Sequence, residues 1–235
     1  CRASALVPDA TGWRAQIDGG DWLNATAVIV ATAAAANELL GANALPLSPL
    51  RGQITLLPRA ALAQAPRCVV CAEGYVAPPH GEWICCGASF VRGAGDFVPT
   101  AAEHHGNLQR LHQILPHVDP AGIDVAALAG RVGYRASTPD RLPVAGPVPD
   151  IDAFRDAYAG LQRNARLPID RIGPYREGLH VSAGHGSRGL TSAPLCAEAI
   201  AAAIAGEPSP LSRRLQRTLS PARFLVRRII KGQLS

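Results

Sequence analysis

Methionine is absent from the 235 residues, aromatic side chains make up only 5% of them, and acids are scarce near the end. No apolar run approaches the roughly 18 residues that a membrane-spanning helix requires, so the sequence predicts no membrane insertion. The start of the chain shows no signal-peptide pattern. With 48% hydrophobic residues the chain can bury a sizeable core, which excludes wholesale disorder. Because it opens at Cys1 within a fold-like pattern, we interpret it as a fragment of a longer protein.

The last part of the chain has no acidic residue at all. The net charge is +5 and the pI about 9.1. Between Pro208 and Ser235 the basic residues are Arg213, Arg214, Arg217, Arg223, Arg227, Arg228 and Lys231. Such a block is typical of an interface with nucleic acid or an anionic surface, for which all of these except Arg223 are candidates. A solvated helix face explains the same pattern, and the sequence leaves both interpretations open.

Six cysteines are present, and the spacing of four invites a zinc interpretation. Cys68 and Cys71 precede the adjacent pair Cys85 and Cys86. Both segments look like strands, where residues three apart or adjacent point to opposite faces. Four thiolates would then not converge into a tetrahedral site. We therefore predict no metal, and buried thiols in a reducing cytoplasm.

The order of the expected elements indicates an α/β protein. An apolar run at 25–31 predicts a strand of a parallel sheet, buried on both faces. The middle of the chain looks antiparallel, with a hairpin around Pro79-His80-Gly81. Helix 101–115 is amphipathic, with His104, His105 and His112 predicted at the surface. The other expected elements are a hairpin at 13–23 turning at Gly19-Gly20, helices at 34–40 and 152–165, and strands at 50–57 and 131–136.

A glycine-rich turn lies between an expected strand at 178–183 and an expected helix at 195–205. Gly184, Gly186 and Gly189 match G-x-G-x-x-G. An ordinary dinucleotide site needs a second strand ending in an acid, whereas here Glu207 lies in a proline-rich break, so we reject that interpretation. A helix N-terminus that faces the ring of a flavin is favoured, because its free N–H groups attract electron-rich atoms. A plain strand-turn-helix connection remains the alternative.

The segment from Val132 to Gly146 is the second informative stretch. Pro139 and Pro143 within it, and Pro147 directly after it, exclude a long helix, so the segment reads as a strand followed by a rigid extended stretch. Arg135 lies on that strand, next to Tyr134, and its planar guanidinium can bind a carboxylate through two parallel hydrogen bonds. A structural salt bridge is the alternative role.

Three motifs in this order carry a family resemblance: Arg51-Gly-Gln53, Tyr134 to Gly146, and Gly184 to Pro194. They resemble the D-amino-acid oxidase and glycine oxidase class of flavoproteins. The Gly-Ser-Arg-Gly-Leu-Thr-Ser-Ala-Pro stretch and the Gly-Glu-Pro-Ser-Pro tail are more specific. They are similar to the C-terminal FAD-dependent oxidase part of the bifunctional tRNA 5-methylaminomethyl-2-thiouridine biosynthesis proteins. The resemblance covers nearly the whole chain.

The resemblance implies an incomplete FAD-binding domain interleaved with a mostly antiparallel substrate-binding sheet. Residues 1–51 and 134–235 would belong to the FAD domain, the latter ending in the basic tail, and 52–133 to the substrate domain. The family's dinucleotide fingerprint would precede Cys1, as would a methyltransferase part. At Ala31-Thr32-Ala33 the usual glycine of the family is absent.

The implied reaction is FAD-dependent oxidation of the 5-carboxymethylaminomethyl group of a tRNA wobble uridine to the 5-aminomethyl form, with release of glyoxylate. Arg135 would bind the substrate carboxylate, with Tyr75 and Tyr134 as candidate pocket walls. The candidates for contact with FAD are Gly184, Gly186, Ser187, Arg188, Gly189, Leu190 and Thr191. Three alternatives stay open: an oxidase of small free amines or amino acids, a noncatalytic RNA-binding fragment, and a simple nucleotide-binding domain. The oligomeric state is not predicted.

Overall fold

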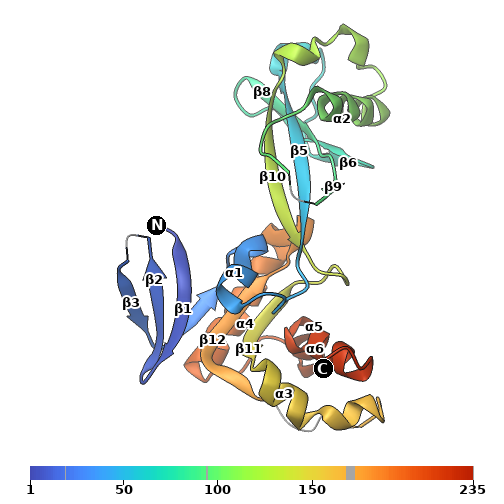
Figure 1. Ribbon diagram of the computed structural model, residues 1–235. Helices are drawn as coiled ribbons and strands as arrows, with labels where there is room; N and C mark the ends of the chain where they lie inside the picture. Colours follow the sequence, from blue (N-terminus) through green and yellow to red (C-terminus); the bar gives the residue numbers. More distant parts are fainter. Residues whose placement is uncertain (19, 94, 168–172, 235) are drawn as a thin grey trace. The chain divides into compact units, whose positions relative to one another are not determined.

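The computed structural model describes residues 1–18, 20–93, 95–167 and 173–234. The chain divides into two compact units, which Figure 1 shows in one ribbon diagram. Unit 1 comprises residues 1–48 and 136–235, and unit 2 comprises residues 49–135. Tyr134 and Arg135 therefore belong to unit 2, not to the returning segment. The assignment of the units to cofactor and substrate stays a prediction.

Unit 1 begins with an antiparallel three-stranded sheet. Its strands are β1 (Ala3–Asp9), β2 (Gly12–Ile17) and β3 (Trp22–Ala25), in the order β1-β2-β3. The β2–β3 pair is the hairpin that the sequence predicted at 13–23, with Trp13 opposite Ala25. The predicted turn was Gly19-Gly20, and Gly19 lies outside the described residues. Trp13 lies in the core of unit 1 and donates its indole N–H to the carbonyl of Glu177.

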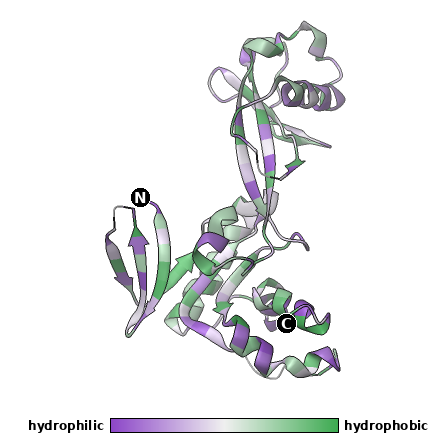
Figure 2. Ribbon diagram, viewed as in Figure 1, coloured by the Kyte–Doolittle hydropathy of each residue, from purple (hydrophilic) through white to green (hydrophobic). Residues whose placement is uncertain are grey.

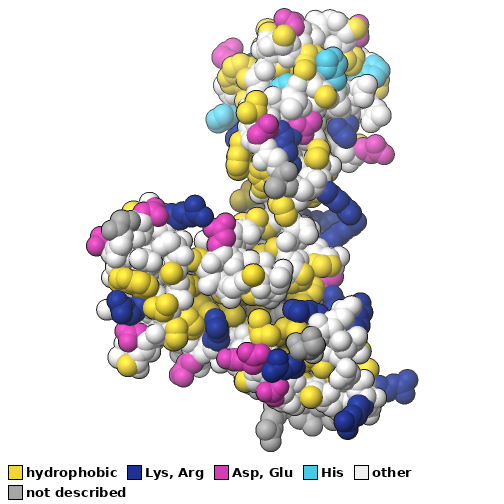
Figure 3. Space-filling model, in the orientation of Figure 1, with side chains coloured by type: hydrophobic (Ala, Val, Ile, Leu, Met, Phe, Trp, Pro, Cys, Tyr) yellow, Lys and Arg dark blue, Asp and Glu magenta, His cyan; other side chains and the backbone are white. Residues whose placement is uncertain are grey.

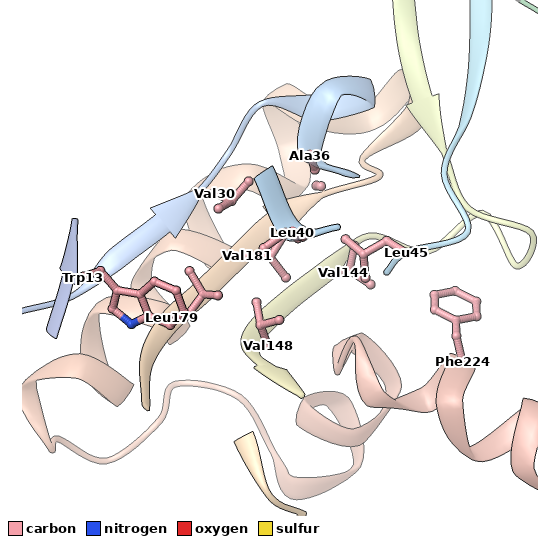
Figure 4. Packing of buried hydrophobic residues seen from close by; sticks show 11 residues of the cluster. Trp13, Val30, Ala36, Leu40, Leu45, Val144, Val148, Leu179, Val181 and Phe224 are labelled. Atoms are coloured by element: carbon pink, nitrogen blue, oxygen red, sulfur yellow. The ribbon is translucent and has the colours of Figure 1, made fainter. Parts of the chain in front are cut away.

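A second sheet forms the centre of unit 1. Strand β12 (Tyr175–Ala183) pairs in parallel with β4 (Val28–Val30) and antiparallel with β11 (Val144–Pro149). Val30, Val144, Leu179 and Val181 lie in the main apolar cluster of this unit, and Figure 4 shows their side chains. The parallel strand predicted at 25–31 is confirmed but shorter. The prediction that this strand is buried on both faces was wrong, because Ile29 is 47% exposed.

Helices surround the sheets of unit 1. A short 3-10 turn, η1 (Ala33–Ala35), leads into α1 (Ala36–Leu40), as expected for 34–40. The helix expected at 152–165 is split into α3 (Ile151–Ala157) and the 3-10 turn η5 (Ala159–Gln162). The chain ends with α5 (Arg213–Leu219) and α6 (Ala222–Ile230). α6 packs on α3 and η5 through a cluster that contains Phe154, Leu161 and Leu225.

Helix α4 (Gly189–Ala205) starts six residues earlier than the predicted Leu195. Pro194 suggested a later start, because proline has no N–H to donate. In the structure the helix continues through Pro194 and gives up one backbone hydrogen bond near its first turn. It follows the 3-10 turn η6 (Gly186–Arg188) and ends at Gly206, which is in the left-handed conformation. Gly189, the last glycine of the glycine-rich segment, is therefore the first residue of the helix.

Unit 2 is built on one sheet with the order β10-β5-β8-β7-β6. The strands are β5 (Ser48–Pro58), β6 (Val70–Cys71), β7 (Tyr75–Val76), β8 (Trp83–Gly87) and β10 (Ala129–Ser137). β5 pairs antiparallel with β8 and with the short β9 (Val91–Arg92), and β7 with β6 and β8. Apolar and polar residues alternate along β5 (Figure 2), which gives the sheet two different faces. The hairpin predicted around Pro79-His80-Gly81 is β7–β8.

Helix α2 (Ala101–Ile114) covers one face of this sheet, close to the predicted 101–115. Leu108 and Leu111 pack with Leu57, Ile84 and Cys86 in the core of unit 2. Short 3-10 turns complete the unit: η2 (Arg59–Ala61), η3 (Pro120–Gly122) and η4 (Val125–Ala127). Because α2 occupies one face only, the side chains at the alternate positions of β5, β8 and β10 face away from it.

The predicted surface position of His104 was wrong. The side chain is only 4% exposed, and its Nδ1 lies 2.9 Å from Oγ1 of Thr55. Asn107, one turn further along α2, donates to the same hydroxyl and to the carbonyl of Gln53. Burial lowers the pKa of His104, which favours the neutral ring. Polar side chains on β5 thus provide the partners that allow polar residues of α2 to be buried.

The cysteines are all free, and only Cys86 and Cys196 are buried. Cys85 and Cys86 alternate between half-buried and buried positions of β8, as a strand requires. Cys68 and Cys71 are exposed, so the prediction of buried thiols was wrong for them. Within residues 1–18, 20–93, 95–167 and 173–234, no group of three His, Cys, Asp or Glu is placed to hold a metal ion. No helix of these residues is long and apolar enough to cross a bilayer.

Ala33, where the family usually has glycine, has φ = 52°. This left-handed conformation costs a residue with a Cβ about 1–2 kcal/mol. Ala33→Gly is therefore expected to raise the free energy of unfolding by about 0.5–1 kcal/mol, after subtraction of the extra entropy of glycine in the unfolded chain. Urea denaturation measures the change. Ala35→Gly is the matched control, because Ala35 has φ = −82° and should lose stability instead. The same sign for both variants would contradict the explanation.

Candidate functional site

Arg135 lies on β10, with its guanidinium extended across the neighbouring strand β5. A Cβ built on Gly52 would collide with the terminal nitrogens of Arg135. Glycine at this position of the Arg51-Gly-Gln53 motif therefore makes room for the arginine. On the far side of the side chain, the guanidinium carbon lies 4.7 Å from the centre of the Phe90 ring. Arg135 is thus held in a slot between β5 and the residues that follow β8.

The guanidinium of Arg135 has no anionic partner within the described part of the chain. Arg135 takes part in none of the ion pairs there, and its buried Nη1 has no hydrogen-bond acceptor. Arg135 is half-buried, and this burial lowers its pKa because it removes part of the solvation of the charge. A structural salt bridge, the alternative from the sequence, is therefore absent from this region. A half-buried cation with a buried nitrogen that lacks an acceptor fits an anionic ligand.

Tyr75 is near Arg135 on the sheet. It lies on β7 opposite Gly87, and its hydroxyl is 4.0 Å from Sγ of Cys85. Burial raises the pKa of Tyr75 to about 12, with smaller contributions from Cys85, so the hydroxyl stays protonated near neutral pH. The structure brings Tyr75 and Arg135 close enough for electrostatic interaction. A neutral phenol beside a cation can donate a hydrogen bond to the same carboxylate.

Tyr134, the other predicted pocket residue, points elsewhere. It neighbours Arg135 on β10, so the two side chains emerge on opposite faces of the sheet. Its hydroxyl accepts from the N–H of Gly95 and donates to the carbonyl of Asp96. Arg51 donates to the carbonyls of Asp96 and Val98 and pairs with Glu103. Tyr134 and Arg51 together hold the backbone that leads into α2.

The glycine-rich turn belongs to unit 1 and connects β12 to α4. Gly184 has φ = 70°, and a Cβ there would lie 2.7 Å from Cγ2 of Thr138. Gly186 also has a positive φ, 56°, but nothing lies within 4 Å of its Cβ direction. The first turn of α4 has no side-chain cap. The N–H groups of Gly189, Leu190 and Thr191 therefore have no partner within the helix.

The residues predicted to contact FAD differ in their exposure and in whether their backbone N–H groups are already hydrogen-bonded. Leu190 is fully exposed, and Thr191 is exposed as well. The N–H of Arg188, by contrast, donates to the carbonyl of His185. Ser187 lies within η6. The open amides are thus those of the first turn of α4 rather than that of Arg188.

His185 is a residue of this turn that the sequence argument missed. Its Nε2 lies 3.1 Å from Oγ of Ser182 and its Nδ1 2.9 Å from Oγ of Ser192. Ser192 donates to the carbonyl of Arg188, so it accepts from Nδ1–H, and Ser182 donates to Nε2. Burial lowers the pKa of His185, which favours this neutral form. The histidine fastens the start of α4 to β12, and its flanking serines were the available signal.

The basic residues of the tail differ in whether they are exposed or paired with an acidic residue. Arg213, Arg214 and Arg217 are exposed on α5, and Lys231 follows α6. Arg223 and Arg227 instead bind the carboxylate of Asp140, at 3.0 Å and 2.9 Å. Arg228 is half-buried. Figure 3 shows several basic side chains on the surface over the C-terminal helices. The structure therefore leaves α5 as the more accessible part of the predicted interface, and gives Arg227 a structural partner.

Residues 1–203 match the profile of the FAD dependent oxidoreductase (DAO) family, so the chain belongs to that family. This confirms the predicted fold class and the resemblance. The chain is similar to a tRNA 5-methylaminomethyl-2-thiouridine biosynthesis bifunctional protein MnmC of Pseudomonas paraeruginosa, 43% identical over 99% of this chain. An MnmC of Pseudomonas putida is 47% identical over 91% of this chain. The chain spans 38% and 34% of the lengths of these two relatives.

Solved structures of amine oxidases share the fold. Glycine oxidase from Geobacillus kaustophilus matches with a TM-score of 0.68 and 23% identity, over 94% of this chain and 52% of that chain. Iminodiacetate oxidase (IdaA) from Chelativorans sp. BNC1 matches with a TM-score of 0.65 and 24% identity, over 89% and 51%. At these identities the likeness shows the fold alone.

The glycine-rich turn fits the edge of a flavin. The open space at Gly186, the absence of a side-chain cap on the first turn and the exposed Leu190 leave the helix N-terminus accessible to an electron-rich group. Family membership indicates FAD dependence. The individual contact residues, from Gly184 to Thr191, stay predictions.

Proposed function

We propose that this chain is the oxidase part of a tRNA-modifying enzyme. Its substrate would be a wobble uridine with a 5-carboxymethylaminomethyl group, which is an N-substituted glycine. Oxidation of the CH–NH bond gives an imine, and water then divides the imine into glyoxylate and the 5-aminomethyl nucleoside. FAD, when bound, supplies the acceptor for the two electrons. The observation that carries the proposal is the half-buried guanidinium of Arg135 on the face of the sheet opposite α2, whose buried Nη1 has no partner among the described residues.

The residues of unit 2 would bind and orient the side arm. Arg135 would hold the carboxylate through two N–H groups, in a slot that Gly52 keeps open. Tyr75, protonated near neutral pH, would donate to the same carboxylate. Fixing this end of the arm restricts where its methylene group lies, which lowers the entropic part of the barrier.

The residues of unit 1 would hold the cofactor. The amides of Gly189, Leu190 and Thr191 would donate to the pyrimidine edge of the flavin, where negative charge develops on reduction. Gly184, Gly186 and Ser187 would let the backbone approach it, and His185 would keep the amides in place. The rest of the FAD site and a methyltransferase part would belong to a longer protein, which agrees with the greater length and the bifunctional names of the relatives.

The test uses the full-length, FAD-loaded protein, with tRNA that carries the 5-carboxymethylaminomethyl group. Loss of two carbons from the nucleoside, together with an equal amount of glyoxylate, is the expected result. The same tRNA without the modification is the control. Turnover of glycine or sarcosine with none of the tRNA would favour an oxidase of small amines instead. A full-length protein that binds RNA but no FAD would favour a noncatalytic RNA-binding role.

The exposed arginines of α5 would contact tRNA phosphates. Changing Arg213, Arg214 and Arg217 together to alanine is expected to weaken tRNA binding and to reduce the slope of log K against log salt by about 2–3, at roughly 0.7–0.9 per lost contact. Titrations between low and physiological salt measure the slope. Arg155→Ala, also on the surface of unit 1 but paired with Asp152, is the control. An unchanged slope in the triple variant would show that α5 does not contact tRNA and that its arginines only face solvent.

A further inference from the structure

An exposed phenylalanine lies next to the unpaired cation of unit 2. Phe90 follows β8 and is 54% exposed, although the guanidinium carbon of Arg135 lies 4.7 Å from the centre of its ring. One side of the ring thus faces the arginine, and much of the rest is open to solvent. Two of the other three phenylalanines, Phe154 and Phe224, are buried in unit 1. Phe90 is therefore an aromatic side chain that the core of its unit does not use.

The sheet face around Phe90 is suited to a flat, partly apolar ligand. Arg135, Tyr75 and Cys85 lie on it, and α2 packs against the opposite side of the sheet. An exposed aromatic face beside a guanidinium without an anionic partner offers a ligand one apolar and one charged contact. The guanidinium of Arg135 can bind a carboxylate, and the exposed face of Phe90 can stack on a planar group. A free small amino acid would satisfy the first requirement only.

A wobble uridine with an N-substituted glycine at position 5 satisfies both requirements in one molecule. Its uracil is planar, and nucleobases unstacked from a loop commonly stack on aromatic side chains. The flexible side arm would let the carboxylate reach past the edge of the ring to Arg135. We propose that Phe90 stacks on the uracil of the substrate nucleoside and so selects nucleoside-borne glycine over small free amines. This inference rests on the proposed function and adds the residue that recognises the base.

The decisive comparison is between two substrates in one variant. Phe90→Leu keeps an apolar side chain but removes the aromatic face. In the full-length, FAD-loaded protein, kcat/KM for the modified tRNA should fall by about 10-fold or more, as expected for the loss of one stacked base. The value for sarcosine, which has no base, should fall by clearly less than the value for the tRNA, because leucine keeps an apolar side chain beside Arg135 and only the base loses its stacking contact. Phe90→Trp, which retains a face for stacking, should restore tRNA turnover.

Trp83→Leu is the matched control. Trp83, like Phe90, is an exposed aromatic residue, 44% exposed, and lies within β8 at an alternate position on the same face as Cys85. It lies about 13 Å along the strand from Gly87, at 3.3 Å per residue. This variant should turn over both substrates like the wild-type protein. Equal losses of both substrates in Phe90→Leu would overturn the proposal, because a general disturbance of Arg135 would act on both.

A binding measurement separates this inference from the proposed reaction. The probe is an anticodon stem-loop RNA with the 5-carboxymethylaminomethyl uridine, titrated into the full-length protein with and without the Phe90→Leu change. Binding weakened about 10-fold supports the role of Phe90 even if the wild-type protein does not oxidise the RNA, in which case only the reaction is wrong. Unchanged binding in the variant overturns the stacking role. A wild-type protein that does not bind the RNA overturns both.

Discussion

Arg135→Ala is expected to lower kcat/KM for the modified tRNA by about 100-fold, since a charge-assisted hydrogen bond contributes roughly 1.5–3 kcal/mol. The loss should affect both substrates, because the carboxylate is common to the tRNA side arm and to sarcosine. The physical reason is the unpaired Nη1 of a guanidinium that burial already leaves poorly solvated. Steady-state kinetics of the full-length, FAD-loaded protein measure the change.

Two further variants show whether the position of the guanidinium matters. Gly52→Ala keeps Arg135 but puts a methyl group where its terminal nitrogens lie, so activity should fall with the charge intact. Arg131→Ala removes an exposed arginine at an alternate position of the same strand and should leave sarcosine turnover nearly unchanged. A loss much smaller than about 10-fold in Arg135→Ala, or 1.4 kcal/mol, would remove this residue from the substrate site.

Asp140→Ala is expected to destabilise unit 1 by about 3 kcal/mol, because it leaves the cation of Arg223 without its anion. The Arg223 and Asp140 side chains are 8% and 17% exposed, and their contacts are supplemented by Thr138 and the backbone at Leu142. Chemical denaturation, monitored for unit 1, measures the loss. Asp152→Ala breaks an exposed pair with Arg155 and should cost less than about 1 kcal/mol. Similar losses in both variants would contradict the assigned role of Asp140.

Acid should reveal the same interaction. Burial alone would raise the pKa of Asp140, but the hydrogen bonds and charge of Arg223 outweigh it and hold the pKa well below its ordinary value. A carboxyl with a lowered pKa stabilises the fold above its unfolded pKa of about 3.9, and this contribution is lost as the pH falls towards the folded pKa. Asp140→Asn should therefore lose stability near neutral pH and show a flatter decline below about pH 4. An unchanged acid profile would exclude this linkage.

Local sequence patterns predicted most of the helices and strands, because residues a few positions apart determine where these elements form. The amphipathic run before Leu115 gave α2 nearly to the residue, and the Pro-His-Gly signal gave the β7–β8 hairpin. The start of α4 was predicted late, since a proline near the first turn of a helix resembles a boundary. Burial was harder to predict. His104 is inside because Thr55, 49 positions earlier, offers a hydroxyl, and no sequence window contains both residues.

In the candidate site, too, the sequence predicted residue types and motifs but not the contacts between distant residues. Glycines and an arginine in a recognisable motif were enough to nominate Arg135 and the turn from Gly184 to Gly189. The sequence could not show that Gly52 makes room for Arg135, that Tyr134 points to the opposite face, or that His185 bonds to two serines. These relations depend on which strands are neighbours in the sheet. Phe90 was missed because one aromatic residue after a strand looks like core until its exposure is known.

By itself, the sequence determined the family, the α/β class, the order of most elements and the chemistry of the principal candidates. These properties follow from residue type, spacing and periodicity, which act over a few positions of the chain. Only the tertiary structure decided which of the charged residues are paired. Arg223 and Arg227 meet Asp140 across more than eighty positions, whereas Arg135 meets no acid in the described residues. Whether a cation has a partner depends on how distant strands and helices pack, and that difference makes Arg135 the candidate for binding substrate.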